Sequence, residues 1–386
     1  MDSAEREGLR PKGNVPNLRF PEFQGEWEEE RLADIADLYK GTGISKDQLS
    51  DDGEPCILYG ELYTKYKSET IREVISKTNI DNTKLVRSKA NDVIIPCSGE
   101  TAEDIATARC VLNGNILLGG DLNIIRLHGY DGAFMSYQLN GRRKYDIAKV
   151  AQGVSVVHLY GEHLKGVKTI NPCLEEQKKI AKLLSLLDER IATQNKIIDK
   201  LQSLIKGIRN DVLEKLRKNI GFNAVVGDVL DYEQPQSYIV EDTEYTNEGT
   251  PVLTANKAFV LGYTLETDGI YDKGDCIIFD DFTLDCKYVD FPFKVKSSAI
   301  KILTAKNKEL LRYAFEFLKY LDLSTEEHKR HYIAETQNQE FIMPTEQMVK
   351  TIAHIFSTLS LRMETAVKQR DVFEKQKQYL LRQMFI

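Results

Sequence analysis

Two long stretches of the chain place apolar residues at alternating steps of four and three. The first has Ile180, Leu184, Leu187, Ile191, Ile198, Leu201, Ile205 and Ile208 on this seam, with the polar Gln194 among them; the second has Ile352, Phe356, Leu359, Met363, Phe373 and Leu380, together with the charged Arg370 and Lys377. This spacing, kept over several heptads, predicts two long helices of the coiled-coil kind. At about 1.5 Å per residue, a helix over 172–218 would be about 70 Å long, which is too long to be buried in a small domain.

The two helical stretches are copies of one sequence. When Pro344 is aligned with Pro172, identical residues fall together without a gap: Lys350 on Lys178, Ile352 on Ile180, Ala353 on Ala181, Ser357 on Ser185, Leu359 on Leu187, Arg362 on Arg190, Thr365 on Thr193, Lys368 on Lys196 and Asp371 on Asp199. Each copy could pack on its own domain as an amphipathic helix. We favour an antiparallel intramolecular coiled coil, and a parallel homodimeric coiled coil is the rival arrangement.

The two helices differ at their predicted starts. Asn171 and Pro172 suit the N-cap and first helical position of the first, and two glutamates follow in its first turn. Glu176 and Gln177 in the first copy are replaced by Met348 and Val349 in the second. The local contacts of the second helix should therefore differ.

The remaining sequence forms two segments of similar size, each with short apolar runs, turn signals and one helical stretch. The runs include DVIIPCS and VSVVHLY in the first segment and DCIIFDDF and SAIKIL in the second. They predict two mixed α/β (α+β) domains from a tandem duplication. The predicted order is an N-terminal segment (1–25), a first domain (26–171), a long helix (172–218), a second domain (219–343) and a second long helix (344–386).

Composition excludes several classes of protein. The 386 residues are 42% apolar, contain no apolar run long enough to cross a membrane, and begin with a charged stretch unlike a leader, so we expect a cytoplasmic protein. Six cysteines without a CxxC pair predict reduced thiols and no metal site. The net charge of −7 opposes coating of nucleic acid by bulk positive charge, although both helical stretches are net basic.

The chain offers little catalytic chemistry. GTGISK at 41–46 lacks the glycine before lysine that a Walker loop requires, and a plain turn is the better interpretation. The adjacent Asp280 and Asp281 could hold Mg²⁺, but neighbouring strand residues point to opposite faces and no nuclease set completes them. We therefore expect a protein that is not an enzyme.

Basic and aromatic residues are interleaved in two clusters of each domain. Such residues can hold DNA phosphates and recognise base edges, although single clusters of this kind are most often solvated faces. The predicted DNA-contacting residues are Tyr63, Lys65, Tyr66, Lys67, Arg142, Arg143 and Lys144 in the first domain and Lys287, Tyr288, Lys294, Lys296, Lys329, Arg330, His331 and Tyr332 in the second.

The whole pattern resembles the specificity (S) subunits of type I restriction-modification systems. NLRFPEFQGEWEEERL looks like the start of such proteins, PCLEEQKKIAKLLSLLDERI like their central repeat, and GEPCILYGELYT, AQGVSVVHLY and KYVDFPFKVKSSAIKIL like parts of their recognition domains. The resemblance implies that each domain recognises one half of a split, asymmetric double-stranded DNA target. It also implies that the helices act as a spacer and dock two modification (methyltransferase) subunits, with restriction subunits joining them.

The resemblance places S-adenosylmethionine, ATP and Mg²⁺ on those partner subunits and no cofactor on this chain. A coiled-coil scaffold that binds protein and not DNA is the alternative from another class. A self-contained nuclease or methyltransferase is disfavoured by the missing motifs.

Overall fold

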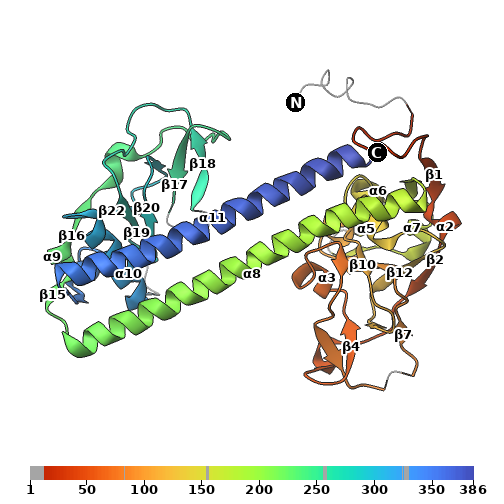
Figure 1. Ribbon diagram of the computed structural model, residues 1–386, viewed down its shortest axis with the longest axis horizontal. Coiled ribbons are helices and arrows are strands. Elements are labelled where there is room, and N and C mark those ends of the chain that lie inside the picture. Colours follow the sequence, from red (N-terminus) through yellow and green to blue (C-terminus); the bar gives the residue numbers. More distant parts are fainter. Residues whose placement is uncertain (1–12, 82, 154–155, 255–258, 324, 326–329) are drawn as a thin grey trace. The chain divides into compact units, whose positions relative to one another are not determined.

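The computed structural model describes residues 13–81, 83–153, 156–254, 259–323, 325 and 330–386 (Figure 1). The chain divides into two compact units, one of Met1–Gln194 with Gln369–Ile386 and the other of Asn195–Lys368. The boundaries between the units fall inside the two long helices, one in α8 (Leu174–Asn219) and the other in α11 (Glu346–Met384). Each unit therefore contains one α/β domain and a part of both helices.

The domain of the first unit is built on a five-stranded sheet of order β2-β12-β8-β10-β5 and a second five-stranded sheet of order β3-β6-β4-β11-β7. The central strands of the first sheet are apolar because both of their faces are covered. The elements of this domain are β1 (Glu28–Arg31), α2 (Leu32–Ile35), β2 (Ala36–Lys40), η1 (Lys46–Gln48), β3 (Leu49–Ser50), β4 (Glu54–Ile57), α3 (Glu61–Thr64), β5 (Thr70–Ile71), β6 (Ser76–Thr78), β7 (Val86–Arg87), β8 (Asp92–Pro96), β9 (Ser98–Gly99), α4 (Ala102–Ile105), β10 (Arg109–Val111), β11 (Leu117–Leu118), β12 (Leu122–Leu127), α5 (Gly132–Asn140), α6 (Lys144–Val150), β13 (Val157–His158), α7 (Gly161–Leu164) and β14 (Lys168–Asn171).

The domain of the second unit repeats this plan in a shorter form. Its main sheet has the order β16-β22-β19-β20, all antiparallel, and a smaller sheet has the order β18-β17-β21. Its elements are β15 (Ala224–Val225), α9 (Val226–Val229), β16 (Leu230–Glu233), η2 (Pro235–Tyr238), β17 (Thr250–Leu253), β18 (Val260–Thr264), β19 (Cys276–Asp280), β20 (Cys286–Val289), β21 (Lys294–Val295), β22 (Ile300–Ala305), α10 (Lys308–Leu321), η3 (Thr336–Asn338) and β23 (Glu340–Phe341).

The main elements of the two domains correspond. In each, the third strand of the main sheet pairs antiparallel with the second, as Ile94 with Ile124 and Ile278 with Ile302. In each, the second strand is followed by a helix whose N-cap side chain accepts from a backbone N–H in the first turn, Asp131 from Phe134 and Asn307 from Leu310, both at 2.8 Å. The predicted fold class, with two duplicated α/β domains and two long helices, is confirmed.

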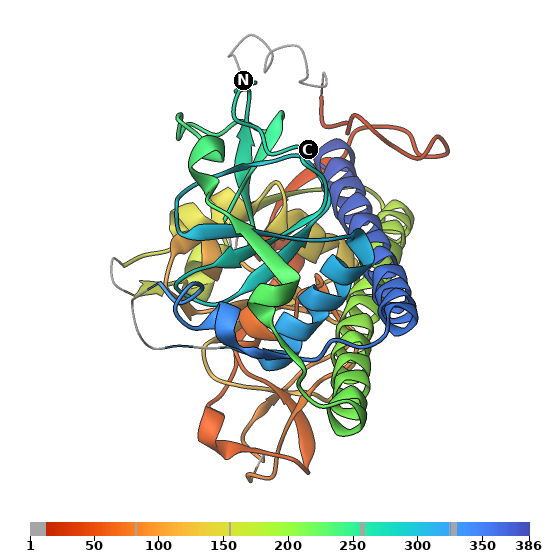
Figure 2. The ribbon, with the colours of Figure 1, turned by 90° about the vertical axis from the view of Figure 1, so that its left-hand side faces the viewer.

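Inside each unit the parts of α8 and α11 lie side by side and run in opposite directions (Figures 1 and 2). In the first unit, Asp188 contacts Lys377 and Arg190 lies over the ring of Phe373. Residue numbers that increase along α8 therefore face residue numbers that decrease along α11. The predicted seam residues are all buried or half-buried, and Ile205, Ile352 and Phe356 belong to one apolar cluster in the second unit. The antiparallel coiled coil is therefore the arrangement adopted within each unit.

The predicted start of the first helix needs correction. Asn171 ends strand β14, and its amide Nδ2 donates to Glu30 Oε2 at 3.0 Å, so α8 begins only at Leu174. Asn171 is held by the strand pair β1–β14, in which it faces Glu28. Of the helices that the structure describes, none is long and apolar enough to cross a bilayer.

Candidate nucleic-acid interface

The first predicted cluster surrounds the short helix α3, and the structure divides its members. Tyr66 is buried with only 7% exposure, and its hydroxyl accepts from the backbone N–H of Ile75 at 3.2 Å. Lys65 is half-exposed and its ammonium donates to the buried Glu61 at 2.6 Å. Lys67 is exposed and donates to the carbonyl oxygen of Tyr63. The assignment of Tyr66 to DNA is therefore corrected, because its side chain belongs to the core.

Tyr63 lines a cleft of about 600 Å³ beside this cluster. Its hydroxyl donates to the carbonyl oxygen of Ser98 at 3.2 Å, and burial raises the pKa of this phenol. The carboxylates of Glu100 and Asp104 also line the cleft, together with Tyr59. Two carboxylates repel a phosphate, so this cleft is a poor place for the DNA backbone.

Two arginines of the second predicted cluster bind the last turn of α11 and the two residues that follow it. Arg142 donates to the carbonyl oxygens of Arg382 and Phe385, at 2.8 and 3.3 Å, and Arg143 donates to that of Ile386 at 3.1 Å. The last carbonyls of a helix have no partner within it, and cations stabilise that end of the dipole. These bonds give Arg142 and Arg143 a structural role, while their contact with DNA, like that of the half-buried Lys144, stays a prediction.

Two predicted members of the second domain form ion pairs or hydrogen bonds in the fold. Lys294 is 4% exposed, and its ammonium pairs with Glu266 and donates to the carbonyl oxygen of Asp268. Tyr288 donates to Asp275 at 2.7 Å. The prediction that Lys294 contacts DNA is corrected, because its side chain is buried and ion-paired, whereas the half-buried Tyr288 stays a prediction.

His331 and Tyr332 are also buried, with 1% and 0% exposure. The backbone N–H groups of both donate to the carboxylate of Asp281, which also pairs with the buried Lys301 at 3.3 Å. Asp281 thus organises the fold of this region, and His331 and Tyr332 are removed from the predicted DNA contacts. The Mg²⁺ interpretation of Asp280 and Asp281 is not supported either, since Asp280 accepts from the backbone of Phe282 and Thr283.

Lys296 and Arg330 are the members of the second set that the structure brings together at the surface. Both are exposed, and Arg330 donates to the hydroxyl of Ser298, two residues from Lys296, at 3.3 Å. Arg330 also lies 6.0 Å from the ring of Phe282. Lys287 is partly exposed and pairs with Asp285 at 3.1 Å, while Lys329 lies outside the described residues. Lys296 and Arg330 remain the best candidates for phosphate contact.

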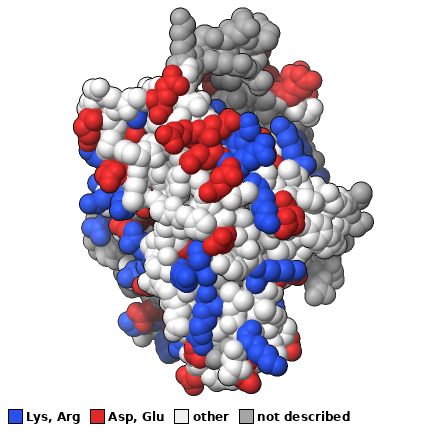
Figure 3. All heavy atoms as spheres, turned by 90° about the vertical axis from the view of Figure 1, so that its right-hand side faces the viewer, with Lys and Arg blue, Asp and Glu red and all other residues white. Residues whose placement is uncertain are grey.

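Figure 3 shows the distribution of charge on one face of the molecule. Lysine and arginine side chains are spread over this face with acidic side chains among them. No large area of one sign is visible there. On this face, therefore, contact with DNA would depend on a few individual residues, because no uniform basic area attracts it.

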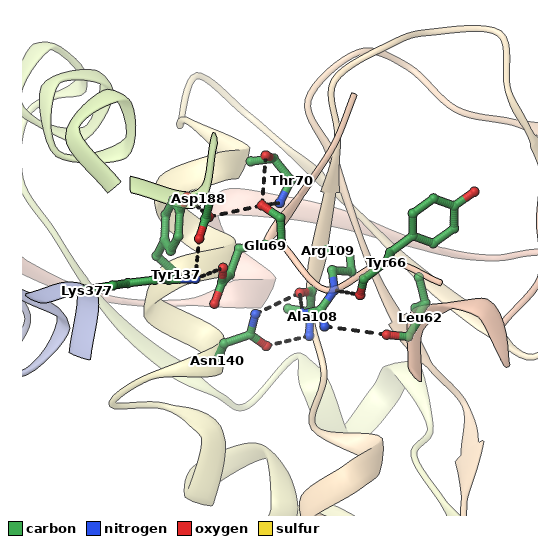
Figure 4. Close-up of polar contacts among 11 residues, drawn as sticks. Leu62, Tyr66, Glu69, Thr70, Ala108, Arg109, Tyr137, Asn140, Asp188 and Lys377 are labelled. Carbon is green, nitrogen blue, oxygen red and sulfur yellow. Dashed lines mark hydrogen bonds and ion pairs between the residues drawn. The ribbon is translucent and has the colours of Figure 1, made fainter. Parts of the chain in front are cut away.

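A buried junction missed at the sequence level joins the first domain to both helices (Figure 4). The ammonium of Lys377, on α11, donates to Glu69 at 2.5 Å and to Asp188, on α8, at 2.6 Å. The hydroxyl of Tyr137, on α5, donates to the same Asp188 carboxylate at 2.6 Å. One lysine therefore binds a side chain of the domain and a side chain of the other helix at the same time.

The electrostatics of this junction follow from its burial. The side chains of Lys377, Glu69 and Asp188 are exposed by only 9–11%. Burial lowers the pKa of Lys377, but the two carboxylates outweigh it and the net shift is upward. Burial raises the pKa of Glu69, against the opposing pull of Lys377. The sequence contained one sign of this junction, because Lys377 is a charged residue on a mostly apolar seam. A charged or polar residue at such a position commonly has a specific partner.

The second unit has a junction of similar design on α10. Glu316, with side-chain exposure of 1%, accepts from Arg209 of α8 and from Arg312, each at 2.8 Å. Arg312 also donates to Ser360 of α11 at 2.5 Å. In both units a helix that follows the second strand of the main sheet, α5 or α10, fixes the domain to the paired helices.

The chain thus has two duplicated domains, each fixed to a pair of long antiparallel helices. Proteins of this architecture form a class with which its sequence and structure can be compared. Residues 24–203 match the family model described as the type I restriction modification DNA specificity domain. Over 140 residues the chain is 44% identical to the EcoR124I/EcoR124II specificity subunit of the type I restriction enzyme of Escherichia coli, a match that covers 34% of this chain and 35% of that protein.

Two further comparisons agree. The chain is 28% identical over 199 residues to the MjaVIII specificity subunit of Methanocaldococcus jannaschii, covering 51% of this chain and 44% of the relative. The matches thus span less than half the length of these relatives. The fold is similar to that of a type I restriction-modification S subunit from M. genitalium, with a TM-score of 0.70, 17% identity, and coverage of 96% of this chain and 99% of that one. These comparisons agree with the resemblance of the sequence to the type I restriction-modification specificity subunits.

Proposed function

We propose that this chain selects the DNA target of a type I restriction-modification complex, with each α/β domain recognising one half of a split, asymmetric sequence. The observation that carries the proposal is the duplication of the domain, in which the four strands of the second main sheet repeat the order of the first four strands of the first, and an equivalent helix anchors each domain. Two similar but not identical recognition domains suit a target with two unlike halves.

The paired helices set the spacing between the two half-sites in this proposal. The α8 helix has 46 residues and α11 has 39, so at about 1.5 Å per residue each is longer than the roughly 34 Å of one DNA turn. Such length leaves room for two modification subunits to dock on the helices. Restriction subunits would join this core.

The chain itself performs no catalysis in this proposal. The methyl donor S-adenosylmethionine, ATP and Mg²⁺ belong to the partner subunits, which methylate or cleave the DNA that this chain selects. Among the residues that the structure describes, no group of three or more His, Cys, Asp or Glu side chains is arranged to hold a metal ion.

Sequencing of methylated bases tests the proposal directly. Cells that express this chain with its modification subunit should methylate one bipartite DNA sequence, and exchange of either domain for that of a relative should change one half only. Methylation that ignores such exchange would contradict it. The alternative of a protein-binding scaffold predicts no DNA affinity that falls with salt, even with the modification subunits present.

A further inference from the structure

The two copies of the helix start are covered differently, and the first is covered by the chain itself. Residues 13–27 run beside the start of α8 and the end of α11, where the backbone N–H of Leu18 donates to the carbonyl oxygen of Gln383 at 2.9 Å (Figure 1). Arg19 makes two hydrogen bonds of 2.7 Å to the carboxylate of Glu176, which has no exposed surface. We name residues 13–27 the N-terminal arm.

An aromatic side chain of the arm packs against residues of both helices of the first unit. Phe20 packs against an apolar cluster that contains Ile180, Leu184 and Met384. The ammonium of Lys179 lies 4.6 Å from the centre of the Phe20 ring and pairs with Glu22. Glu176 and Lys179 therefore each bind one charged residue of the arm.

The matching face of the second unit is an open, mostly apolar groove of about 370 Å³. It is lined by Gln347, Met348, Thr351, Ile352 and Ile355 of α11 and by Val212, Lys215, Leu216 and Asn219 of α8. In the repeat, Met348, Thr351 and Ile355 stand at the positions of Glu176, Lys179 and Leu183. The side chains of Met348 and Ile355 are each 38% exposed.

No counterpart of the arm precedes the second domain. The four residues 220–223 join α8 directly to β15, whereas residues 13–27 precede the equivalent strand β1. Both charged positions that hold the arm are uncharged here, since methionine and threonine replace Glu176 and Lys179. The arm of a second copy is a poor occupant, because its Arg19 would lose water against Met348 without gaining a carboxylate.

We propose that an apolar, aromatic-bearing segment of one modification subunit occupies this groove. The floor offers Met348, Ile352 and Leu216 to such side chains, and the amide and hydroxyl groups of Asn219, Gln347 and Thr351 at its edge can bond the main chain of the segment. This inference rests on the proposed function. It makes the two docking positions unlike, since one helix start is already covered by the arm and the other takes its cover from a partner.

Charged substitutions in the groove test the inference in the purified complex of the full chain with its modification subunit. Ile355→Asp should lower the affinity for one modification subunit at least tenfold, so that native mass spectrometry finds complexes with a single modification subunit. Leu361→Asp is the matched control, because Leu361 lies on the same helix, is 64% exposed and is outside the groove. It should change the affinity less than twofold.

Met348→Glu gives a second, milder variant, since it restores the residue found in the first copy of the repeat. It should weaken the same single docking event. Equal affinities for Ile355→Asp, Met348→Glu and the parent chain would overturn the inference, as would equal losses in Ile355→Asp and Leu361→Asp. Specific DNA methylation by the parent complex, measured in parallel, separates a failure of this inference from a failure of the proposed function.

Discussion

Removal of the charge on Lys377 should loosen the end of α11 strongly. In Lys377→Met the aliphatic part of the side chain is kept, but Glu69 and Asp188 lose their shared cation in a site where they are about one-tenth exposed. Breaking a buried ion pair by removing one partner costs about 3–5 kcal/mol. Since 1.4 kcal/mol is a factor of ten, the population of the opened helix end should rise by about 10²- to 10³-fold or more.

Hydrogen exchange is the suitable assay, because a chain with two compact units has no single free energy of unfolding. Amides of residues 370–386 should exchange faster by that factor in Lys377→Met. Lys375→Met, an exposed position two residues away, should change exchange by less than about 0.5 kcal/mol. The triple change Lys377→Met, Glu69→Gln, Asp188→Asn should recover most of the loss, because no carboxylate is then left unpaired.

The pH dependence gives a further check on the cause. Burial already raises the pKa of Glu69, and loss of Lys377 removes the opposing attraction, so the folded pKa of Glu69 lies further above its unfolded value. A group of this kind favours the folded state at low pH and ceases to do so as pH rises through its folded pKa. Lys377→Met should therefore be less disturbed at pH 5 than at pH 8. An effect below 1 kcal/mol at pH 8, or one equal to that of Lys375→Met, would refute the buried-pair account.

Three more predictions follow from the site. Lys296→Ala and Arg330→Ala should each weaken DNA binding by the assembled complex about three- to tenfold and reduce its salt dependence by about one phosphate contact. Lys273→Ala is the control, because Lys273 is exposed and paired with Glu233, and it should leave DNA binding unchanged. Equal effects of the three variants in a filter-binding titration would contradict the assignment. Arg142→Ala with Arg143→Ala should lower the free energy of local opening at residues 380–386 by about 1 kcal/mol, measured as faster hydrogen exchange, because both arginines bind carbonyl oxygens there. A parallel loss of DNA affinity in the assembled complex would show that they contact DNA as well. The exposed Cys173 should react first with a thiol reagent at pH 8, because burial raises the pKa of Cys56 and Cys97 to about 11 and leaves little of their thiolate. Early labelling of Cys56 or Cys97, detected by mass spectrometry, would argue against the fold around these two residues.

The arrangement of the helices was predictable because a seam repeated over many turns has few other interpretations. The duplication was equally visible in the residues shared by the two copies, and the structure extends it to the strand order of both main sheets. The start of α8 was misplaced because Asn171 satisfies a β-strand pairing with the distant Glu28, which local capping preference does not reveal.

Several of the residues predicted to contact DNA are buried in the fold, for a physical reason. A basic residue in a sequence cluster can face solvent or a carboxylate far along the chain, and composition does not distinguish the two. Lys294 pairs with Glu266, and Arg143 binds the carbonyl oxygen of Ile386, both contacts between segments distant in sequence. Such partners appear only when the fold brings the segments together.

The first strand and the last strand of each domain are neighbours. Glu28 of β1 faces Asn171 of β14, and Ala224 of β15 faces Phe341 of β23, so the chain enters and leaves each domain at one place. A segment with closely spaced ends can be replaced by another of different length without disturbing what lies outside it. Each domain is thus a segment that recombination at its strand pair can exchange, and under the proposed function such an exchange would give the same helices a new target sequence.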